Sequence, residues 1–261
     1  MEDPVYQSIV SEGLAGAENA WMNLLMRTKL RSGHKKITVV DCGPASPEES
    51  IRKLTKLMRA VTVAQYVAID MNAHLLAKIR LRVSGATGIP TKFIQSRFED
   101  LDHDSLADVA SEEVLILFGS TEMNYEPEEL ALVLQRFCAP GMLLAVESLL
   151  LTDGGSTAGY ESEAVQQFAF GPLWLLNAHR DQFDFNALFL DGRIILEYRA
   201  KCSIVFNAEG YPALREGDAV WTAFSRRPTL VQHRADFGQL AETLGTLVTH
   251  GRIASSLGRF R

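Results

Sequence analysis

Short apolar runs alternate with helical patterns between residues 37 and 151 of this 261-residue chain. The run ITVVDC (37–42) is rich in β-branched residues, and in the next segment (47–61) the apolar residues recur at helical spacing. Further strands are expected at 66–70, 91–96, 112–120 and 141–151, and further helices at 71–83 and 127–137. Nearly all-apolar strands that alternate with helices are typical of parallel sheets covered on both faces. The sequence therefore predicts an α/β fold with a mostly parallel central sheet.

The segments on either side of this alternation carry different patterns. Residues 1–36 have helical spacing, and we expect an N-terminal helical segment that packs on a main domain spanning 37–261. The alternatives for this segment are a lid or a homodimer contact. Residues 160–180 have the pattern of a helix, while 193–206 and 218–226 alternate like antiparallel strands. We expect these C-terminal strands to extend the sheet.

Composition limits the classes of partner. The net charge of −6 disfavours a broad nucleic-acid surface, and the basic clusters at 29–36 and 252–261 are interpreted as solvated. The three cysteines fit neither a zinc site nor a disulfide framework, and Cys42 and Cys138 lie in or beside apolar runs. The six histidines are scattered, and no apolar run is long enough to span a bilayer. We expect a cytoplasmic protein that binds a small molecule, without a metal, nucleic acid or membrane.

The turn after the first strand, DCGPASPEES, raises the question of a cofactor. It lacks the G-x-G-x-x-G fingerprint of dinucleotide-binding loops, and the chain contains no P-loop. S-adenosylmethionine has no phosphates, but it needs one close backbone approach and an acid near its ammonium group. Gly43 permits the approach because it has no Cβ, Asp41 can supply the acid, and Pro44 belongs to the same turn. An ordinary connection between strand and helix explains the stretch equally well.

Acidic residues also follow the second and third strands. Asp70, with Met71 beside it, ends the second strand, where a carboxylate can accept both ribose hydroxyls of a nucleoside. Asp70 could also cap the next helix, and the two roles can coexist. In the stretch SRFEDLD, Phe98 could pack on an adenine ring while Glu99 or Asp100 accepts from its amino group. A solvated acidic loop is the alternative.

The stretch after the fourth strand, LFGSTEMNYEPEEL, is the most informative. A buried strand stops at Gly119 and Ser120, which would border the cofactor, and a helix begins shortly after Tyr125. Asn124 is a polar residue at the carboxyl end of the expected sheet, where the ligands of such sheets bind. It is either a turn residue or a substrate ligand, and Tyr125 would lie beside the same substrate.

Residues 116–151, ILFGSTEMNYEPEELALVLQRFCAPGMLLAVESLLL, resemble the ergothioneine-pathway histidine Nα-methyltransferases and their relatives, which include a fungal enzyme that N-methylates a prenylated tryptophan. The family carries a G-S-T-x-x-N pattern after its fourth strand, and Gly119, Ser120, Thr121 and Asn124 match it. The resemblance continues in FAFGPLWLLNAHRDQFDFNALF and VWTAFSRRPT. It implies a Rossmann-like class I methyltransferase fold with S-adenosyl-L-methionine as cofactor.

The resemblance also implies roles for single residues. Asn124 would hold the amino and carboxylate region of the substrate. Tyr160, on the helix after the fifth strand, would contact the substrate amine, and Ser225 matches a serine of the family's late strand.

Some positions depart from the family pattern. Ala45 and Glu49 replace a glycine and a lysine of the first turn, and Arg97 replaces an acid after the third strand. Ala223 replaces a late-strand glutamate that binds the histidine imidazole, so histidine is not the expected substrate.

These observations lead to one hypothesis and its alternatives. The chain is expected to be an S-adenosylmethionine-dependent N-methyltransferase that acts on a small amine, an amino acid or a derivative, in secondary metabolism. Asn124 and Tyr160 are the catalytic candidates, because they would orient the amine in line with the methyl group. The alternatives are methyl transfer to oxygen or carbon of a small metabolite, and a non-catalytic subunit that uses the fold for binding.

Overall fold

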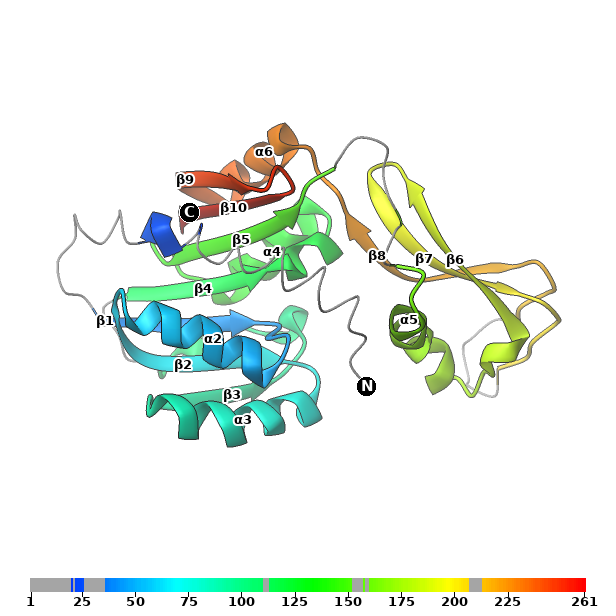
Figure 1. The fold of residues 1–261 in the computed structure, drawn as a ribbon, viewed down its shortest axis with the longest axis horizontal. Helices are drawn as coiled ribbons and strands as arrows, with labels where there is room; N and C mark the ends of the chain where they lie inside the picture. Colours follow the sequence, from blue (N-terminus) through cyan, green and yellow to red (C-terminus); the bar gives the residue numbers. More distant parts are fainter. Residues whose placement is uncertain are drawn as a thin grey trace. The chain divides into compact units, whose positions relative to one another are not determined.

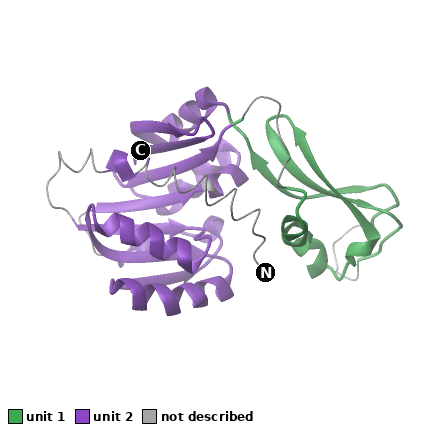
Figure 2. Cartoon of the chain, viewed as in Figure 1, with its two compact units in different colours: residues 1–14, 151–228 green, residues 15–150, 229–261 purple. Residues whose placement is uncertain are grey.

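The computed structural model describes residues 20, 22–25, 36–109, 113–151, 157, 160–206 and 213–261. The chain divides into two compact units (Figure 2). Unit 1 comprises Met1–Leu14 and Leu151–Pro228, and unit 2 comprises Ala15–Leu150 and Thr229–Arg261. The predicted segment 1–36 lies almost entirely outside the described residues, so its boundary stays a prediction. The predicted domain 37–261 contains parts of both units.

Unit 2 is built on a seven-stranded sheet in the order β3-β2-β1-β4-β5-β10-β9 (Figure 1). The strands are β1 Lys36–Cys42, β2 Thr62–Asp70, β3 Thr91–Gln95, β4 Glu113–Gly119, β5 Leu143–Leu149, β9 Ala241–Thr249 and β10 Ile253–Phe260. The first five pair in parallel, and β10 is antiparallel to both of its neighbours. This arrangement confirms the predicted α/β fold with a mostly parallel sheet. Because β1 lies between β2 and β4, the strand order reverses at β1, where ligands of such sheets bind.

Helices cover both faces of this sheet. In Figure 1, α2 (Pro47–Met58) and α3 (Ala73–Thr87) lie in front of the strands, and α4 (Pro127–Phe137) lies behind them with α6 (Leu230–Leu240). Adjacent residues of β1 show the alternation. Val39 is buried in the apolar cluster that contains residues of α2 and α3, whereas Val40 is buried in the cluster of α4 and α6. Successive residues of β1 therefore point to opposite faces of the sheet, and both faces are covered by helices. This explains why the sequence of β1 is apolar nearly throughout.

The described part of the N-terminal segment packs within unit 2. Residues 22–25 are helical, and Met22, Leu24 and Leu25 are buried in the same apolar cluster as Ile37 and Leu257. For these residues the expectation of packing within one chain agrees with the structure.

Unit 1 contains a separate three-stranded antiparallel sheet, in the order β6-β7-β8. Its strands are β6 Phe183–Leu190, β7 Arg193–Ala200 and β8 Ala219–Arg226, and its helix is α5 Glu163–Leu175. We expected 193–206 and 218–226 to extend the large sheet, and this expectation is wrong. The strand β7 is paired on one edge with β6 and on the other with β8. The small sheet also has its own aromatic core, in which the rings of Phe170 and Tyr198 lie 5.2 Å apart.

The C-terminal strands β9 and β10 complete the large sheet instead. The segment 252–261, interpreted from its arginines as a solvated basic tail, contains β10, in which Ser255, Ser256 and Leu257 are fully buried. Arg259 is paired with Glu113 at 2.9 Å. The small residues of IASSLG give little apolar signal, so the burial of β10 follows from its pairing with β5 and β9 rather than from a local pattern.

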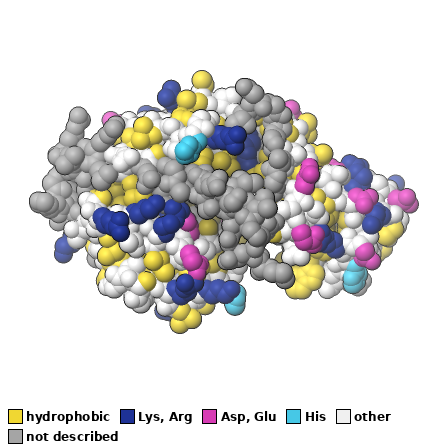
Figure 3. All heavy atoms as spheres, in the orientation of Figure 1, with side chains coloured by type: hydrophobic (Ala, Val, Ile, Leu, Met, Phe, Trp, Pro, Cys, Tyr) yellow, Lys and Arg dark blue, Asp and Glu magenta, His cyan; other side chains and the backbone are white. Residues whose placement is uncertain are grey.

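The surface charges are mixed, and two of the three cysteines are buried. On the face drawn in Figure 3, groups of basic side chains lie among acidic and apolar ones. Cys42 and Cys138 are buried thiols, as expected, and burial raises the pKa of both; Cys202 is exposed. Among the described residues, no helix has both the length and the apolar character needed to cross a membrane.

Candidate functional site

The loops at the carboxyl ends of β1, β2 and β3 are joined by backbone hydrogen bonds. The amide of Gly43, after β1, donates to the carbonyl of Ile69 in β2 at 2.9 Å. The amide of Ser96, after β3, donates to the carbonyl of Asp70 at 3.2 Å. The structure therefore brings the predicted first turn, Asp70 and the third-strand loop to one edge of the sheet.

The first turn depends on Gly43. Its φ of +75° is in the left-handed region, and an added Cβ would lie 2.7 Å from Oγ1 of Thr121. That hydroxyl donates to the carbonyl of Cys42 at 3.5 Å. The close approach made by Gly43 in the structure is therefore to Thr121, a residue that sequence reasoning did not assign to this turn.

The rest of the turn leads into α2. Pro44 is buried, Ser46 caps α2 by accepting from the amide of Glu49 at 3.1 Å, and Pro47 occupies the first helical position. The carboxylate of Glu49 accepts from Arg52 at 2.7 Å. Glu49 thus belongs to the first turn of α2, where an acid is favourable.

Replacing Gly43 with alanine tests the role of this contact. We expect Gly43→Ala to lower the free energy of unfolding by about 1–3 kcal/mol, because both the left-handed φ and the contact with Thr121 oppose a Cβ. Gly88→Ala is the matched control, since Gly88 has a φ of +67° but nothing within 4 Å of an added Cβ. Urea denaturation measures the free energy of unfolding of both variants. An equal loss in the two variants would show that the Thr121 contact is unimportant.

Asp41 is buried on the side of the sheet that α2 covers. Its carboxylate accepts from the hydroxyl of Tyr66 at 2.9 Å and lies 3.4 Å from Nζ of Lys53. Glu147 of β5, which accepts from Ser255 at 3.1 Å, is buried on the same side. Burial raises the pKa of Glu147 to about 7, although the charge of Lys53 opposes the shift. The sequence predicted the acid at position 41 but not this buried charge cluster.

Asp70 ends β2 with one carboxylate oxygen engaged. Its Oδ1 accepts from the amide of Asn72 at 2.7 Å, and Asn72, not Asp70, caps α3. No other hydrogen bond to the Asp70 carboxylate is found among the described residues. Burial raises the pKa of Asp70, although the Asn72 amide acts in the opposite direction. The neighbouring Met71 is 69% exposed, which is unusual for a large apolar side chain.

The loop after β3 contacts the loop after β4. The ring of Phe98 packs against Phe118 at a centroid distance of 5.2 Å, and Glu99 accepts from the hydroxyl of Tyr125 at 2.9 Å. Burial acts to raise the pKa of Glu99, but hydrogen bonds from its own backbone and from Tyr125, together with Arg97, lower it. Asp100 lies in the same short 3₁₀ turn, Phe98–Asp100.

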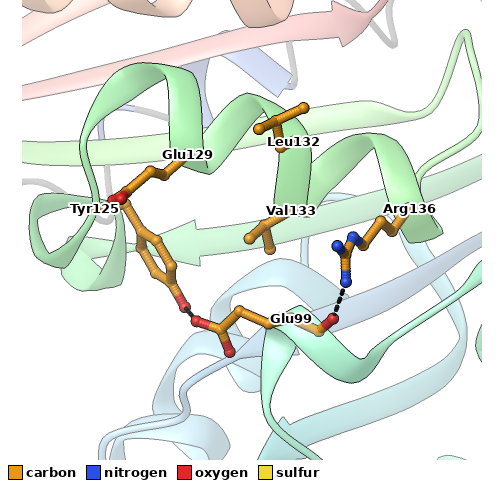
Figure 4. Close-up of a pocket in the computed structure, with 6 residues that line it drawn as sticks. All are labelled: Glu99, Tyr125, Glu129, Leu132, Val133 and Arg136. Carbon is orange, nitrogen blue, oxygen red and sulfur yellow. Dashed lines mark hydrogen bonds between the residues drawn. The ribbon is translucent and has the colours of Figure 1, made fainter.

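A pocket of about 280 Å³ opens beside this contact. Figure 4 shows Tyr125 and Glu99 pointing toward one another at one side of it and the outer surface of α4 at the other. Its lining residues are Glu99, Tyr125, Glu129, Leu132, Val133 and Arg136.

The turn after β4 presents Asn124. Gly119 ends β4 with φ +49° and ψ −144°, a conformation open essentially to glycine alone, and Ser120 begins the 3₁₀ turn η3 (Ser120–Asn124). The next residues are anchored in the unit. Glu122 accepts from the hydroxyl of Ser148, and Sδ of Met123 accepts from the amide of Leu149 at 3.1 Å. Asn124 follows these anchors with its side chain exposed at the carboxyl end of β4.

The remaining candidates belong to unit 1. Tyr160 lies in a turn before α5, which begins at Glu163, so the expectation that it lies on that helix is wrong. The buried Arg227 donates to Oγ of Ser225 at 2.7 Å and to the hydroxyl of Tyr160, and its guanidinium lies 5.4 Å from the centre of the Tyr160 ring. Tyr160 and Ser225 are thus brought together by an arginine that sequence reasoning missed.

Comparisons with known proteins agree with this arrangement. Residues 23–164 match the family model described as "Histidine-specific methyltransferase, SAM-dependent". A search of curated proteins finds no match. The PH0226 protein from Pyrococcus horikoshii OT3 is similar in structure, with a TM-score of 0.51 and 11% identity over 92% of this chain and 90% of that one. At this identity the likeness concerns the fold alone.

Two looser structural matches have TM-scores below 0.5 and carry no further argument. The S-adenosylmethionine-dependent methyltransferase SibL has a TM-score of 0.46 and 10% identity over 92% of this chain and 55% of that one. A SAM-dependent methyltransferase from Methanosarcina mazei has a TM-score of 0.43 and 11% identity over 87% and 92%, respectively.

Proposed function

Since this chain belongs to the family of SAM-dependent, histidine-specific methyltransferases, we propose that it methylates the nitrogen of a small amine, an amino acid or a derivative of one. S-adenosylmethionine is its methyl donor, and family membership favours an enzyme over the non-catalytic subunit considered from the sequence. The role in secondary metabolism, the cytoplasmic location and the homodimer stay predictions.

The residues at the ends of β1 and β2 fit this cofactor. The carboxylate of Asp70 keeps one oxygen available to the ribose hydroxyls, and the exposed Met71 can cover an apolar ring face. Glu49 does not oppose the carboxylate of the cofactor, because Arg52 neutralises it within α2. Asp41, Gly43, Pro44, Phe98, Glu99, Gly119 and Ser120 complete the proposed cofactor shell. When bound, the cofactor supplies an electrophilic methyl group on a sulfonium.

The observation that carries the assignment of an amine is the placement of Asn124. Its amide is exposed at the carboxyl end of β4, directly after residues that are anchored to β5. A carboxamide oxygen can accept from an amine N–H and so hold the nitrogen lone pair in one direction, which is what in-line methyl transfer requires. Tyr125 is proposed as a further substrate ligand because it follows Asn124, and Tyr160 and Ser225 are proposed on the ground of the family resemblance.

The departure at position 223 supports an amine other than histidine. Ala223 packs in the apolar core of unit 1, so this position offers no carboxylate to an imidazole. The test is to incubate the protein with S-adenosylmethionine and single amino acids, histidine and tryptophan among them, and to measure S-adenosylhomocysteine release and the site of methylation. We expect N-methylation of an amino acid other than histidine. Turnover only with hydroxyl or carbon acceptors would contradict the proposal and favour the alternative reactions.

The ribose assignment gives a binding prediction that needs no substrate. We expect Asp70→Ala to weaken calorimetric binding of S-adenosylhomocysteine by about tenfold to a hundredfold, because hydrogen bonds to a charged acceptor are lost. Asp108→Ala is the control, since Asp108 is an exposed acid whose carboxylate lies 3.4 Å from Nζ of Lys92 and has no proposed role in binding. Unchanged affinity in Asp70→Ala would refute this role of Asp70.

A further inference from the structure

A chain of buried polar side chains connects η3 to the far edge of the sheet in unit 2. Ser148 donates to Glu122, and its Oγ lies 2.6 Å from Nδ1 of His233 in α6. The other ring nitrogen of His233 lies 2.8 Å from Oγ of Ser256, which lies 2.7 Å from Oγ1 of Thr246. Glu122, Ser148, His233 and Ser256 are each at most 6% exposed.

The carboxylate at one end fixes the direction of every hydrogen bond in this chain. Glu122 accepts from Ser148, so the single hydroxyl proton of Ser148 points to Glu122. Ser148 must then accept from His233, which places the imidazole proton on Nδ1. The unprotonated Nε2 accepts from Ser256, and Ser256 accepts from Thr246.

The imidazole is suited to this neutral form. Burial lowers the pKa of His233 to about 4, although the charge of Asp236 opposes the shift. At neutral pH the ring therefore has one N–H and one acceptor nitrogen, which is what its two serine neighbours need. Protonation would put donors at both nitrogens and disturb the order of the chain.

The chain determines how Glu122 is held. A buried carboxylate is costly unless hydrogen bonds replace its hydration. Donation from His233 polarises the Ser148 hydroxyl, which strengthens the bond from Ser148 to Glu122. Since Glu122 is one of the anchors of η3, its hydrogen bonds influence the position of the whole turn.

From this geometry we infer that His233 is a positioning residue for methyl transfer: it acts through Ser148 and Glu122 to hold η3, the turn that presents Asn124. This role rests on the proposed function of Asn124. His233 itself contacts neither the cofactor nor the substrate in this proposal.

Two substitutions at His233 separate hydrogen bonding from packing. The side-chain nitrogen of asparagine can occupy the place of Nδ1, whereas that of glutamine corresponds to Nε2. Both His233→Asn and His233→Gln lose the ring that stacks on Phe237 at a centroid distance of 6.5 Å. Only His233→Asn keeps a donor aimed at Ser148.

The measurement is hydrogen exchange of the Tyr125 amide, which donates to the carbonyl of Glu122 at 3.1 Å and is protected only while η3 is formed. We expect His233→Gln to reduce this protection about tenfold and to lower kcat about tenfold with unchanged affinity for S-adenosylhomocysteine. His233→Asn should stay within about threefold of the wild type in both quantities. Nitrogen NMR of the wild-type imidazole should find the proton on Nδ1.

Equal losses in the two variants would overturn the proposal, because they would indicate packing alone. So would a proton on Nε2 or an unaltered Tyr125 amide in His233→Gln. Should a variant fail to fold, Ser148→Ala provides the same amide measurement, with reduced protection expected and full protection contradicting the proposal. The exchange and NMR results need no substrate, so they test the role of His233 even if no amine is methylated. In that outcome only the proposed function fails.

Discussion

Glu147→Gln is expected to stabilise the protein more near pH 8 than near pH 4. The difference in the free energy of unfolding between variant and wild type should be up to about 3 kcal/mol larger at the higher pH. Burial raises the pKa of Glu147 from 4.5 to about 7 in the folded protein. Between these values the folded state keeps a proton that the unfolded state has released, so stability falls as pH rises through this window. The loss is nearly complete near pH 8, where most wild-type molecules contain an ionised buried carboxylate. Glutamine has nearly the same shape and does not titrate.

The measurement is urea denaturation of wild type and variant near pH 4 and pH 8. His233, whose pKa is lowered from 6.5 to about 4, has the opposite effect: the protein loses stability as the pH falls below 6.5. This loss is the same in wild type and variant, so it cancels in the comparison. Glu242→Gln, at an exposed position of β9, is the control and should change stability by less than about 0.5 kcal/mol. A difference between wild type and Glu147→Gln that is independent of pH would show that Glu147 does not titrate in this range.

Glu147 also affects the charges near the end of β1, where the cofactor is proposed to bind. Lys53 lies 3.4 Å from Asp41 and its charge also acts on Glu147, so this cation affects both carboxylates. Glu147→Gln removes one of the two negative charges on which Lys53 acts.

The parallel half of the sheet could be predicted because each strand contains its own signal. ITVVDC and YVAID are largely apolar runs with an acid at or next to their last residue, and they are apolar because helices cover both faces of β1 and β2. The strand β10 has no such signal. Its buried serines are stabilised by partners far away in the sequence, such as the bond between Ser255 and Glu147, which are 108 residues apart.

The same distinction applies to the candidate site. Asp70 and Asn124 could be proposed because the carboxyl ends of parallel strands are where ligands bind, and a polar residue there is visible in the sequence. The residues that support them could not. Ser148 and His233 are 85 residues apart, and their contact depends on α6 returning to the sheet after the segment Leu151–Pro228 of unit 1. Arg227 was overlooked for a similar reason, because its hydroxyl partner at Tyr160 is 67 residues away.

Asn124→Ala is expected to lower kcat/KM for the methylated amine by about a hundredfold and to leave binding of S-adenosylhomocysteine unchanged. The substitution removes the proposed acceptor for the amine N–H, so the nitrogen lone pair is no longer held in line with the methyl group. It does not disturb the anchors of η3, because Asn124 is exposed and the anchoring contacts are made by the residues before it. Gln135→Ala, at an exposed position of α4, is the control.

Asn124→Asp makes the same prediction sharper, because it preserves the size of the side chain and adds a charge. A carboxylate beside the amine stabilises the ammonium form, so the fraction of neutral amine falls at a given pH. The pH profile of kcat/KM should therefore shift to higher pH, and activity should recover in part under alkaline conditions. A structural role for Asn124 predicts a loss that is independent of pH in both variants. Wild-type turnover in Asn124→Ala would remove Asn124 from the reaction, and the amine would then have to be oriented by another residue.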